Sequence, residues 1–516
     1  MSVQVQSIIN KGSTGLVVDI ECHLSNNLPN IVIVGFANKA VDEAKERLRG
    51  AFANCKLQMP RKRVIINLAP ADVPKADSGF DLAIAVAILA ASQQIQIATF
   101  GDAVFIGELG LDGTTRAVRG IIGKILAGRS HGIDTFYIPR ANMIQAQLVP
   151  DIRLYAVENL SQLYAHFNGI EPLAVSLTGH GQLPELPDRI ISAKDEPPSL
   201  SEIVGQENAK RALQIAAAGG HNILLNGPPG TGKSMLAKAL PSVIPAMDRE
   251  EILEVTHLHS LASHNYEQII TERPFRAPHH SASHIAVIGG GSALRPGEIS
   301  LAHRGVLFFD ELPEFSRPTL EALRQPLEDR IISVARAKDS ADYPADFILV
   351  ATANPCPCGY YGTSGECTCA PQLIARYQQK LSGPILDRID LYSDVHEVNH
   401  RKLLGNPANP SADADTRELI RKARQRQAAR YGSNQLNAAM SNSDIKRHAL
   451  LEPEARDVLN TAAVQLNISA RAYMRTIKVA RTIADLAGSE SITLPHITEA
   501  LAYRPQRITS QNQARV

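Results

Sequence analysis

The chain has 516 residues, of which 44% are hydrophobic and 20% are charged, with 53 basic against 52 acidic side chains. A single hydrophobic core rarely extends over a chain of this length, so we expect about two to four domains in a globular protein. The balanced charge excludes a globally basic surface of the kind that attracts nucleic acid, and no apolar run approaches the ~20 residues that span a bilayer.

The first 15 residues contain neither the basic region nor the unbroken apolar region of a secretory signal peptide. We therefore expect a cytoplasmic protein without a membrane partner. Because thiols stay reduced in that compartment, Cys22 and Cys55, which are isolated in the sequence, are expected to be small core residues.

Strand and helix patterns alternate over residues 1–180, which predicts an N-terminal α/β domain. Helices are expected over residues 38–54 and 80–92, and the second is nearly all apolar and therefore buried. Strands are expected over residues 30–35, 63–70 and 103–110.

Glycine, proline and charge replace this periodicity over residues 181–199, as is typical of an interdomain linker. Strand and helix patterns resume over residues 200–395, which predicts a second α/β domain. A further break rich in Pro, Ala and Asp, at residues 406–416, lies in a third segment, residues 396–516, that is expected to be helical.

Residues 223–240, ILLNGPPGTGKSMLAKAL, read as a strand, a glycine loop and a helix, and the loop matches the phosphate-binding pattern GxxxxGK[ST]. Glycines let backbone N–H groups surround phosphates, Lys233 supplies positive charge and Ser234 supplies a hydroxyl for Mg²⁺. The sequence therefore predicts a site for ATP and Mg²⁺. Its loop residues are Gly227, Pro228, Pro229, Gly230, Thr231, Gly232, Lys233 and Ser234.

Two further strand patterns end in polar residues. After the first, Asp310 is expected to bind Mg²⁺ and Glu311 to polarise the attacking water. After the second, Asn354 is expected to orient that water, or merely to form a turn before proline. Arg388 lies between acidic residues in SGPILDRIDL and, on this pattern alone, could be a surface ion-pair partner.

Four of the six cysteines lie in one loop, NPCPCGYYGTSGECTCAP, at residues 354–371. Four thiolates satisfy tetrahedral Zn²⁺, which would stiffen a loop too poor in apolar residues to build a core. The CxC spacing is tighter than the usual CxxC, so reduced thiols remain the alternative to zinc. The residues concerned are Cys356, Cys358, Cys367 and Cys369.

The C-terminal segment contains two helical patterns. Residues 416–432 carry six basic side chains, which form either a patch for DNA or a solvated helix face. Residues 454–488 have apolar positions at steps of three and four, as a helical bundle requires. Ser469 is expected to cap the helix that carries Arg471.

Residues 273–291, RPFRAPHHSASHIAVIGGG, and 295–315, RPGEISLAHRGVLFFDELPEF, resemble the hallmark of the magnesium-chelatase-like AAA+ ATPases. The stretches NIVIVGFANKAVDEAKERLRGAF (30–52) and RVIINLAPADVPKADSGFDLAIA (63–85) resemble the YifB/ComM family within them. This resemblance implies an ATPase that forms a hexamer with ATP between subunits. It also implies that Arg388 is an arginine finger for the neighbouring subunit and that Arg471 is the second sensor, from a helical lid.

The same resemblance places His279 and His280 in an insertion and residues 329–339 in a hairpin, both projecting into the channel of the ring. Arg336 and Lys338 of this hairpin are expected to contact the DNA backbone, unless they are solvated turn charges. The two adjacent histidines lack a second ligand pair nearby, which favours a structural or substrate-sensing role over a metal site.

The N-terminal segment resembles the Lon-protease (S5-like) fold. Gly79 and Ile122 occupy the positions of the serine nucleophile and the lysine base, and neither has that chemistry. Ser78 and Lys124 lie one and two residues away, but a displaced lysine on a helix would face another direction. We therefore expect a degenerate Lon-like domain without peptidase activity.

The function that the resemblance implies is a DNA motor that drives branch migration while transforming DNA is integrated by homologous recombination. Its expected partners are single-stranded and branched DNA, and recombination proteins. Two alternatives stay open, an ATP-dependent protein-remodelling machine or Lon-like protease, and the ATPase subunit of a metal chelatase. The chelatase alternative lacks support because the chain contains no metal-binding DxSxS motif.

Overall fold

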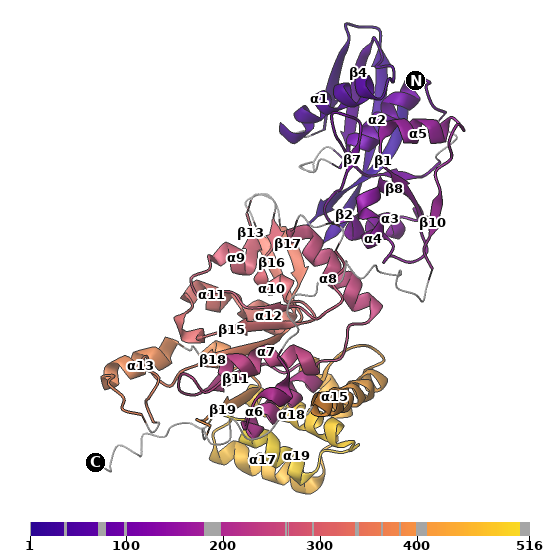
Figure 1. Ribbon diagram of the computed structural model, residues 1–516. Helices are drawn as coiled ribbons and strands as arrows, with labels where there is room; N and C mark the ends of the chain where they lie inside the picture. Colours follow the sequence, from indigo (N-terminus) through magenta and orange to yellow (C-terminus); the bar gives the residue numbers. More distant parts are fainter. Residues whose placement is uncertain are drawn as a thin grey trace.

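The protein is described by a computed structural model with three parts stacked along one direction (Figure 1). An N-terminal α/β domain forms one end, a central α/β domain with a parallel sheet follows, and helices from the C-terminal part of the chain form the other end. The predicted fold class is confirmed. The structure describes residues 2–35, 39–70, 79–96, 101–179, 198–263, 266, 268–291, 294–335, 340–362, 365–380, 383–398 and 410–505.

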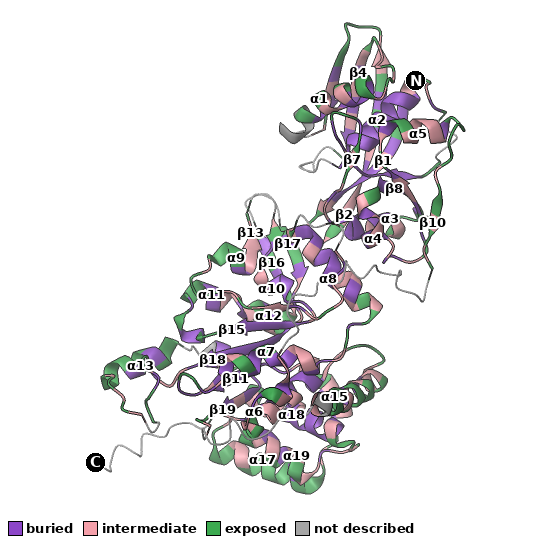
Figure 2. Cartoon of the chain, viewed as in Figure 1, coloured by how far each residue is buried: buried purple, intermediate pink, exposed green. Residues whose placement is uncertain are grey.

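The N-terminal domain is built on a mixed sheet of eight strands. In spatial order these are β10 (Val175–Leu177), β9 (Arg153–Val157), β8 (Thr135–Pro139), β5 (Val104–Phe105), β1 (Ser2–Lys11), β2 (Thr14–Ser25), β4 (Arg63–Ala69) and β3 (Asn30–Val34). Its helices are α1 (Lys39–Asn54), α2 (Asp81–Ala91), α3 (Ile121–Ser130), α4 (Met143–Ala146) and α5 (Leu160–Phe167). The apolar helix α2 is buried over most of its length, as expected (Figure 2).

The single strand predicted at residues 103–110 was wrong in extent. The structure has two short strands, β5 and β6 (Glu108–Leu109), and β6 leaves the large sheet to pair with β7 (Thr115–Arg116). The chain leaves the sheet at Gly107, whose N–H donates to the carbonyl of Gly79 rather than to a neighbouring strand. An apolar pattern alone does not reveal such a change of partner.

The central domain has a parallel sheet in the order β12-β15-β18-β11-β19, and all described residues of β15 and β18 are buried. Such burial requires covered faces on both sides of the sheet, which suits runs such as VLFF and ILVATA. The strands are β11 (Ile223–Asn226), β12 (Phe275–Arg276), β15 (Val306–Phe309), β18 (Ile348–Ala353) and β19 (Leu391–Asp394). The helices are α6 (Glu207–Gly219), α7 (Lys233–Val243), α8 (Arg249–Ala262), α9 (His284–Ile288), α10 (Glu298–Leu301), α11 (Arg317–Ala322), α12 (Arg324–Asp329), α13 (Pro371–Lys380) and α14 (Gly383–Leu386).

Two hairpins extend from the central domain. The first pairs β13 (Gly289–Gly290) with β14 (Arg295–Pro296), and the second pairs β16 (Ile331–Ala335) with β17 (Ser340–Pro344). The β16–β17 hairpin confirms the hairpin predicted around residues 329–339.

The C-terminal helices pack on the central domain and share one apolar core with it. They are α15 (Pro410–Tyr431), α16 (Asn442–His448), α17 (Pro453–Gln465), α18 (Ala470–Ala487) and α19 (Leu494–Ala502). The break predicted at residues 406–416 is wrong from Pro410 onward, because α15 begins there. Asp413 in this helix accepts hydrogen bonds from the backbone N–H groups of Leu200 and Ser201, at 2.9 Å each. Among the described helices, none combines the length and the hydropathy needed to cross a bilayer.

The N-terminal domain docks on the central domain through α3, α8 and the turn between β1 and β2. Apolar residues of α3 and α8 belong to one buried cluster. In the turn, the Ser13 hydroxyl donates to the carbonyl of Asp342 on β17 at 2.8 Å, and the ring of buried His257 lies 2.7 Å from the Ser13 carbonyl. The joint is therefore packed and hydrogen-bonded.

Candidate active site

The phosphate loop lies at the carboxyl end of β11. Gly232 precedes α7 with a φ of 88°, a left-handed conformation that favours glycine. A β-carbon at Gly227 would lie 2.2 Å from the carbonyl oxygen of Val395, so this position also requires glycine. The loop therefore depends on glycine at both positions and leads directly into the first turn of α7, and a glycine loop before a helix N-terminus is typical of a phosphate site.

Lys233 is held inside this loop. Its Nζ donates to the carbonyls of Gly227 and Pro228 at 2.7 Å each and to Oδ1 of Asn354 at 3.1 Å. Burial lowers the pKa of Lys233, and the charges of Asp310 and Glu311 oppose this effect. The structure thus brings together the lysine and the asparagine that the sequence placed far apart.

The Mg²⁺ ligands expected from the sequence lie side by side. The Ser234 hydroxyl donates to Oδ2 of Asp310 at 3.1 Å. Two neighbouring ligands of an octahedral Mg²⁺, each at about 2.1 Å, are roughly 3 Å apart, so this oxygen pair fits the ion. Asp310 is exposed and therefore open to a metal with its shell of water.

Thr352, on β18, fixes the two carboxylates that follow β15. Its hydroxyl donates to Oδ1 of Asp310 at 2.6 Å and accepts from the backbone N–H of Glu311 at 2.8 Å. Glu311 has a φ of 52°, which is costly for a residue other than glycine, and the bond to Thr352 helps to hold it there. Glu311 is exposed at the loop and can contact a water molecule.

Arg388 and Arg471 do not lie in this pocket. Both contact Glu328 at the end of α12, and the distance from Arg471 to Glu328 is 2.8 Å. Arg471 and Glu328 line an open cleft of about 1110 Å³, and the described residues around it include none from the phosphate loop. Ser469 caps α18 by accepting from the N–H of Ala472, as predicted.

The cleft lies at the opposite edge of the sheet from the phosphate loop. Part of its lining consists of residues that precede strands of the central sheet, whereas the phosphate loop, Asp310 and Asn354 follow strands. Strands of four to six residues separate the two edges, about 13–20 Å at 3.3 Å per residue. The residues of the cleft that precede strands of the central sheet include Asn222, Arg304, Phe347 and Asp390. Arg471, which lines the cleft, and Arg388, which precedes β19, therefore lie at the opposite edge of the sheet from the phosphate loop.

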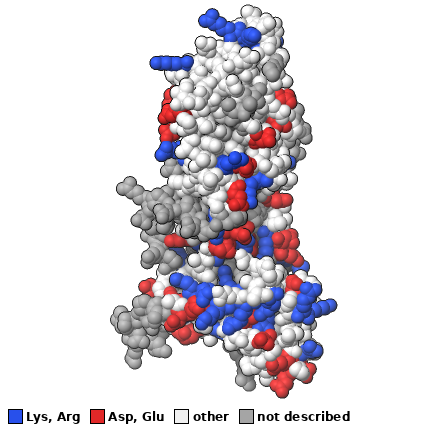
Figure 3. Space-filling view, turned by 90° about the vertical axis from the view of Figure 1, so that its right-hand side faces the viewer, with Lys and Arg blue, Asp and Glu red and all other residues white. Residues whose placement is uncertain are grey.

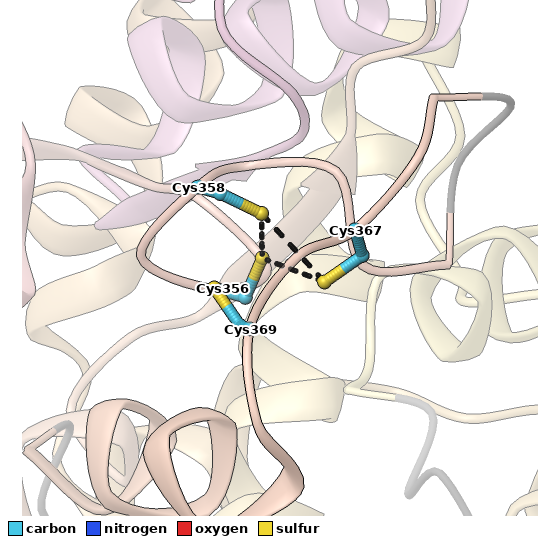
Figure 4. A group of neighbouring side chains, drawn as sticks. All are labelled: Cys356, Cys358, Cys367 and Cys369. Atoms are coloured by element: carbon cyan, nitrogen blue, oxygen red, sulfur yellow. Dashed lines mark hydrogen bonds between the residues drawn. The ribbon is translucent and has the colours of Figure 1, made fainter.

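The four loop cysteines come together (Figure 4). Their sulfur atoms all lie within 4.8 Å of one another, and three pairs are separated by 3.3, 3.6 and 3.8 Å. Zn–S bonds of about 2.3 Å in a tetrahedron require sulfur atoms about 3.8 Å apart, so the cluster fits Zn²⁺. Without a metal, a backbone N–H from Tyr360 is the largest cause that lowers the pKa of Cys358 to about 6. At Cys367 and Cys369 a backbone hydrogen bond lowers the pKa, but burial and hydrogen bonds to Cys358 and Cys356 outweigh it and raise the pKa of Cys367 to about 11 and that of Cys369, so the thiols share protons around one thiolate. Cys22 is buried, as expected, and Cys55 is half-buried.

The cysteine loop also contacts the phosphate loop. A β-carbon at Gly359 would lie 2.4 Å from Cδ of Pro229. The side chain of Gln378, on α13, donates to the carbonyl of Pro355 at 3.2 Å and closes the loop from the other side. A change in the cysteine cluster would therefore alter the packing against the phosphate loop.

Several predicted residues stay apart from this site. Arg336 and Lys338, the expected DNA contacts, lie outside the described residues. The rings of His279 and His280 contact each other in a tilted arrangement with centroids 4.1 Å apart, and the His279 ring forms a hydrogen bond with the Ser281 hydroxyl. Among the described residues, only the cysteines form a cluster with metal-binding geometry.

In the N-terminal domain, Ile122 is completely buried on α3, and Lys124 is also inaccessible to solvent. Gly79 makes a backbone contact with Gly107. Ser78, the other member of the displaced serine–lysine pair, lies outside the described residues.

The six basic side chains of α15 all have partners within the chain. Figure 3 shows a band of Lys and Arg across the lower half of the molecule, with acidic side chains among them. Arg421 and Lys422 pair with Glu418, and Arg430 pairs with Asp485. The carbonyl acceptors of the other three arginines are Ser242 for Arg417, Ala217 for Arg424 and Asp485 for Arg426. This favours a structural role for α15 over a free patch for DNA.

The sequence did not single out Thr352 or Glu328. A single threonine inside an apolar strand, ILVATA, is a weak sequence signal. Because β18 pairs with β15, Thr352 lies where its hydroxyl can bond to both Asp310 and Glu311. Glu328 has no local signal, because its partners lie 60 and 143 residues away in the chain.

Comparisons with known proteins cover nearly the whole chain. The family model described as magnesium chelatase, subunit ChlI, matches residues 199–403, and related models of the ChlI subunit and of its C-terminal part match residues 20–142 and 410–504. Competence protein ComM of Haemophilus influenzae is 43% identical over 97% of each chain. The protein YifB of Escherichia coli is 40% identical over 94% of each chain. The magnesium-chelatase 38 kDa subunit of Rhodobacter capsulatus is 28% identical over 44% of this chain and 69% of its own.

Proposed function

Because the chain belongs to the YifB/ComM family of magnesium-chelatase-like AAA+ ATPases, we propose that it is a DNA motor driven by ATP hydrolysis between subunits of a homohexamer. The observation that supports this proposal is that two groups of residues with complementary chemistry lie at opposite edges of the central sheet. One edge of the sheet has the phosphate loop, Asp310 and Glu311, and the opposite edge has Arg388 and Arg471. A ring places one edge of each subunit against the other edge of its neighbour.

Each group of the chain has a defined task in this reaction. Lys233 exchanges its carbonyl acceptors for phosphate oxygens. Glu311 accepts a proton from the attacking water, and Asn354 orients that water beside the lysine. Ser234 and Asp310 would hold Mg²⁺, which would supply positive charge to the β- and γ-phosphates.

Arg388 of the neighbouring subunit would supply the positive charge that stabilises the transferred phosphoryl group. An arginine delivered in this way contributes about 10³- to 10⁵-fold to the rate in well-studied nucleotide hydrolases. Hydrolysis would therefore depend on assembly, and an isolated subunit would be nearly inactive.

DNA as the substrate is supported by similarity to a relative that is named a competence protein. Arg336 and Lys338 lie in sequence between the two strands of the β16–β17 hairpin. A motor that grips phosphate charge moves along DNA without reading its sequence. We assign to this motor the branch migration that integrates transforming DNA, with single-stranded and branched DNA and recombination proteins as partners.

A protein-directed machine or protease is less well supported, because Gly79 and Ile122 occupy the positions of the serine and the lysine of the Lon dyad. A chelatase role has the support of a weaker similarity that covers less than half of this chain. ATPase stimulated by unfolded protein rather than by DNA would favour the first of these alternatives.

We also assign Zn²⁺ to the four loop cysteines as a structural ion, on the fit of their sulfur positions. Four thiolates leave no open position for a substrate, so this ion would stiffen the loop behind Asn354 rather than take part in hydrolysis. Elemental analysis of protein purified without chelators should find one zinc per subunit, and its absence would reject the assignment.

The proposed function is tested by ATP-dependent branch migration on a labelled four-way DNA junction. The Lys233→Ala variant should lose both ATPase and migration. Lys238→Ala is the matched control, because Lys238 is exposed on the same helix and lies outside the loop. Migration by Lys233→Ala at the wild-type rate, or ATPase without any effect of DNA, would overturn the proposal.

A further inference from the structure

The carboxylate of Glu328 joins the two arginines at the subunit edge. Its Oε2 accepts a hydrogen bond from Arg388, which precedes β19, and its Oε1 accepts from Arg471, in the first turn of α18, at 2.8 Å. The guanidinium groups thus come from elements far apart in the chain, and a single side chain of α12 bridges them. These contacts lower the pKa of Glu328, with the hydrogen bond from Arg388 as the largest cause.

A second ion pair fixes the spacing of the same elements. Arg475, one turn beyond Arg471 on α18, donates to Oδ1 of Asp390 at 2.8 Å. Asp390 is buried two residues after Arg388, and its other oxygen accepts from the N–H of Asn222. Because α18 and the start of β19 are locked together in this way, Arg388 and Arg471 are held on one side of Glu328.

The two arginines share the carboxylate of Glu328 as a common acceptor. The Arg388 side chain is only 11% exposed, and a charge so placed is costly without a counter-ion. A γ-phosphate carries more negative charge and more acceptor oxygens than a carboxylate, so it competes well for both arginines.

We propose that Glu328 is a positioning residue for ATP hydrolysis, which holds Arg388 and Arg471 together in a subunit without a nucleotide-loaded neighbour and releases them to the incoming γ-phosphate. This inference rests on the proposed function, because it needs the neighbour's ATP at that edge. Glu328 would hold the two arginines in position before the nucleotide arrives and would compete with the nucleotide for them.

The Glu328→Gln variant separates these two effects, because it keeps the shape of the side chain and removes its charge. Loss of competition should lower the KM for ATP by about 2- to 5-fold, and loss of alignment should lower kcat by about 5- to 20-fold. Glu328→Asp keeps the charge and should return the KM toward the wild-type value. The control is Glu321→Gln. Among the ion pairs of the described residues, Glu321 pairs only with Arg324, which is three residues away on the next helix.

A double-mutant cycle shows whether Glu328 acts through the arginines. Glu328→Gln should lower kcat much less in an Arg471→Ala background than in the wild type, because the residues act as a unit. Hexamer content and melting temperature are measured for each variant, so that kinetics are compared only between assembled rings. Fully additive effects, or Glu328→Gln kinetics equal to those of Glu321→Gln, would overturn this inference. If Arg388→Ala is inactive while Glu328→Gln matches the wild type, the inference about Glu328 fails and the proposed function stands. If Arg388→Ala is fully active, the proposed function itself fails.

Discussion

Replacing Thr352 with valine tests how the carboxylates of the active site are fixed. The change keeps the volume of the side chain and removes the hydroxyl that bridges Oδ1 of Asp310 and the N–H of Glu311. A hydrogen bond to a charged group contributes about 1.5–3 kcal/mol and one to a neutral group about 0.5–1.5 kcal/mol. Water can replace part of this at exposed Asp310, so we expect a net loss of about 1–2 kcal/mol in the transition state, roughly a 5- to 30-fold fall in kcat/KM.

The assay is steady-state ATP hydrolysis by assembled protein, with Thr352→Ser as the matched control because serine retains the hydroxyl. The serine variant should stay within about 3-fold of the wild type, since it loses a methyl group and keeps both bonds. A folded, assembled Thr352→Val protein with wild-type kcat/KM would refute the idea that Thr352 positions Asp310 and Glu311.

Three further predictions concern the supporting structure. Cys356→Ala should abolish zinc binding and lower the melting temperature, as measured by elemental analysis and calorimetry, and equal melting temperatures would contradict a structural ion. Gly123→Val would place a β-carbon 2.4 Å from the ring of His257, so it should destabilise the domain joint by about 1–3 kcal/mol and speed proteolysis between the domains; unchanged protection would contradict this. Asp390→Asn should cost about 3–5 kcal/mol at pH 7, by denaturant titration, because it leaves Arg475 unpaired. Burial raises the pKa of Asp390, but the charge of Arg475 and a hydrogen bond from His221 lower it by more, so the folded-state pKa lies far below normal. The wild type therefore loses this contribution to its free energy of unfolding as the pH falls below about 4, and the variant should show no such loss.

The nucleotide-binding half of the site could be predicted from the sequence because its signals are local. A strand, a glycine loop and a helix lie within 18 consecutive residues, and the strands before Asp310 and Asn354 end in polar residues after apolar runs. The parallel sheet then brings these strand ends to one edge, as such sheets do. The bond from Lys233 to Asn354 is the direct consequence.

The arginine half could not be placed in the same way, because its contacts join distant parts of the chain. Glu328 and Arg471 are 143 residues apart, and only the packing of α18 on the central domain brings them together. The start of α15 was missed for a related reason. Proline is well suited to the first turn of a helix, and Asp413 docks on residues 200 and 201, yet the composition alone resembled a linker.

The central claim, that neighbouring subunits complete one another's catalytic site, is tested most directly by mixing two inactive variants. Lys233→Ala lacks a working phosphate loop and Arg388→Ala lacks the finger, so each alone should be nearly inactive. In mixed rings, a Lys233→Ala subunit donates its intact Arg388 to the intact phosphate loop of an Arg388→Ala neighbour. With random mixing of equal amounts in a cyclic ring, this arrangement occurs at roughly a quarter of the interfaces. The account predicts recovery of ATPase toward that fraction, and mixed rings as inactive as their parents would contradict it.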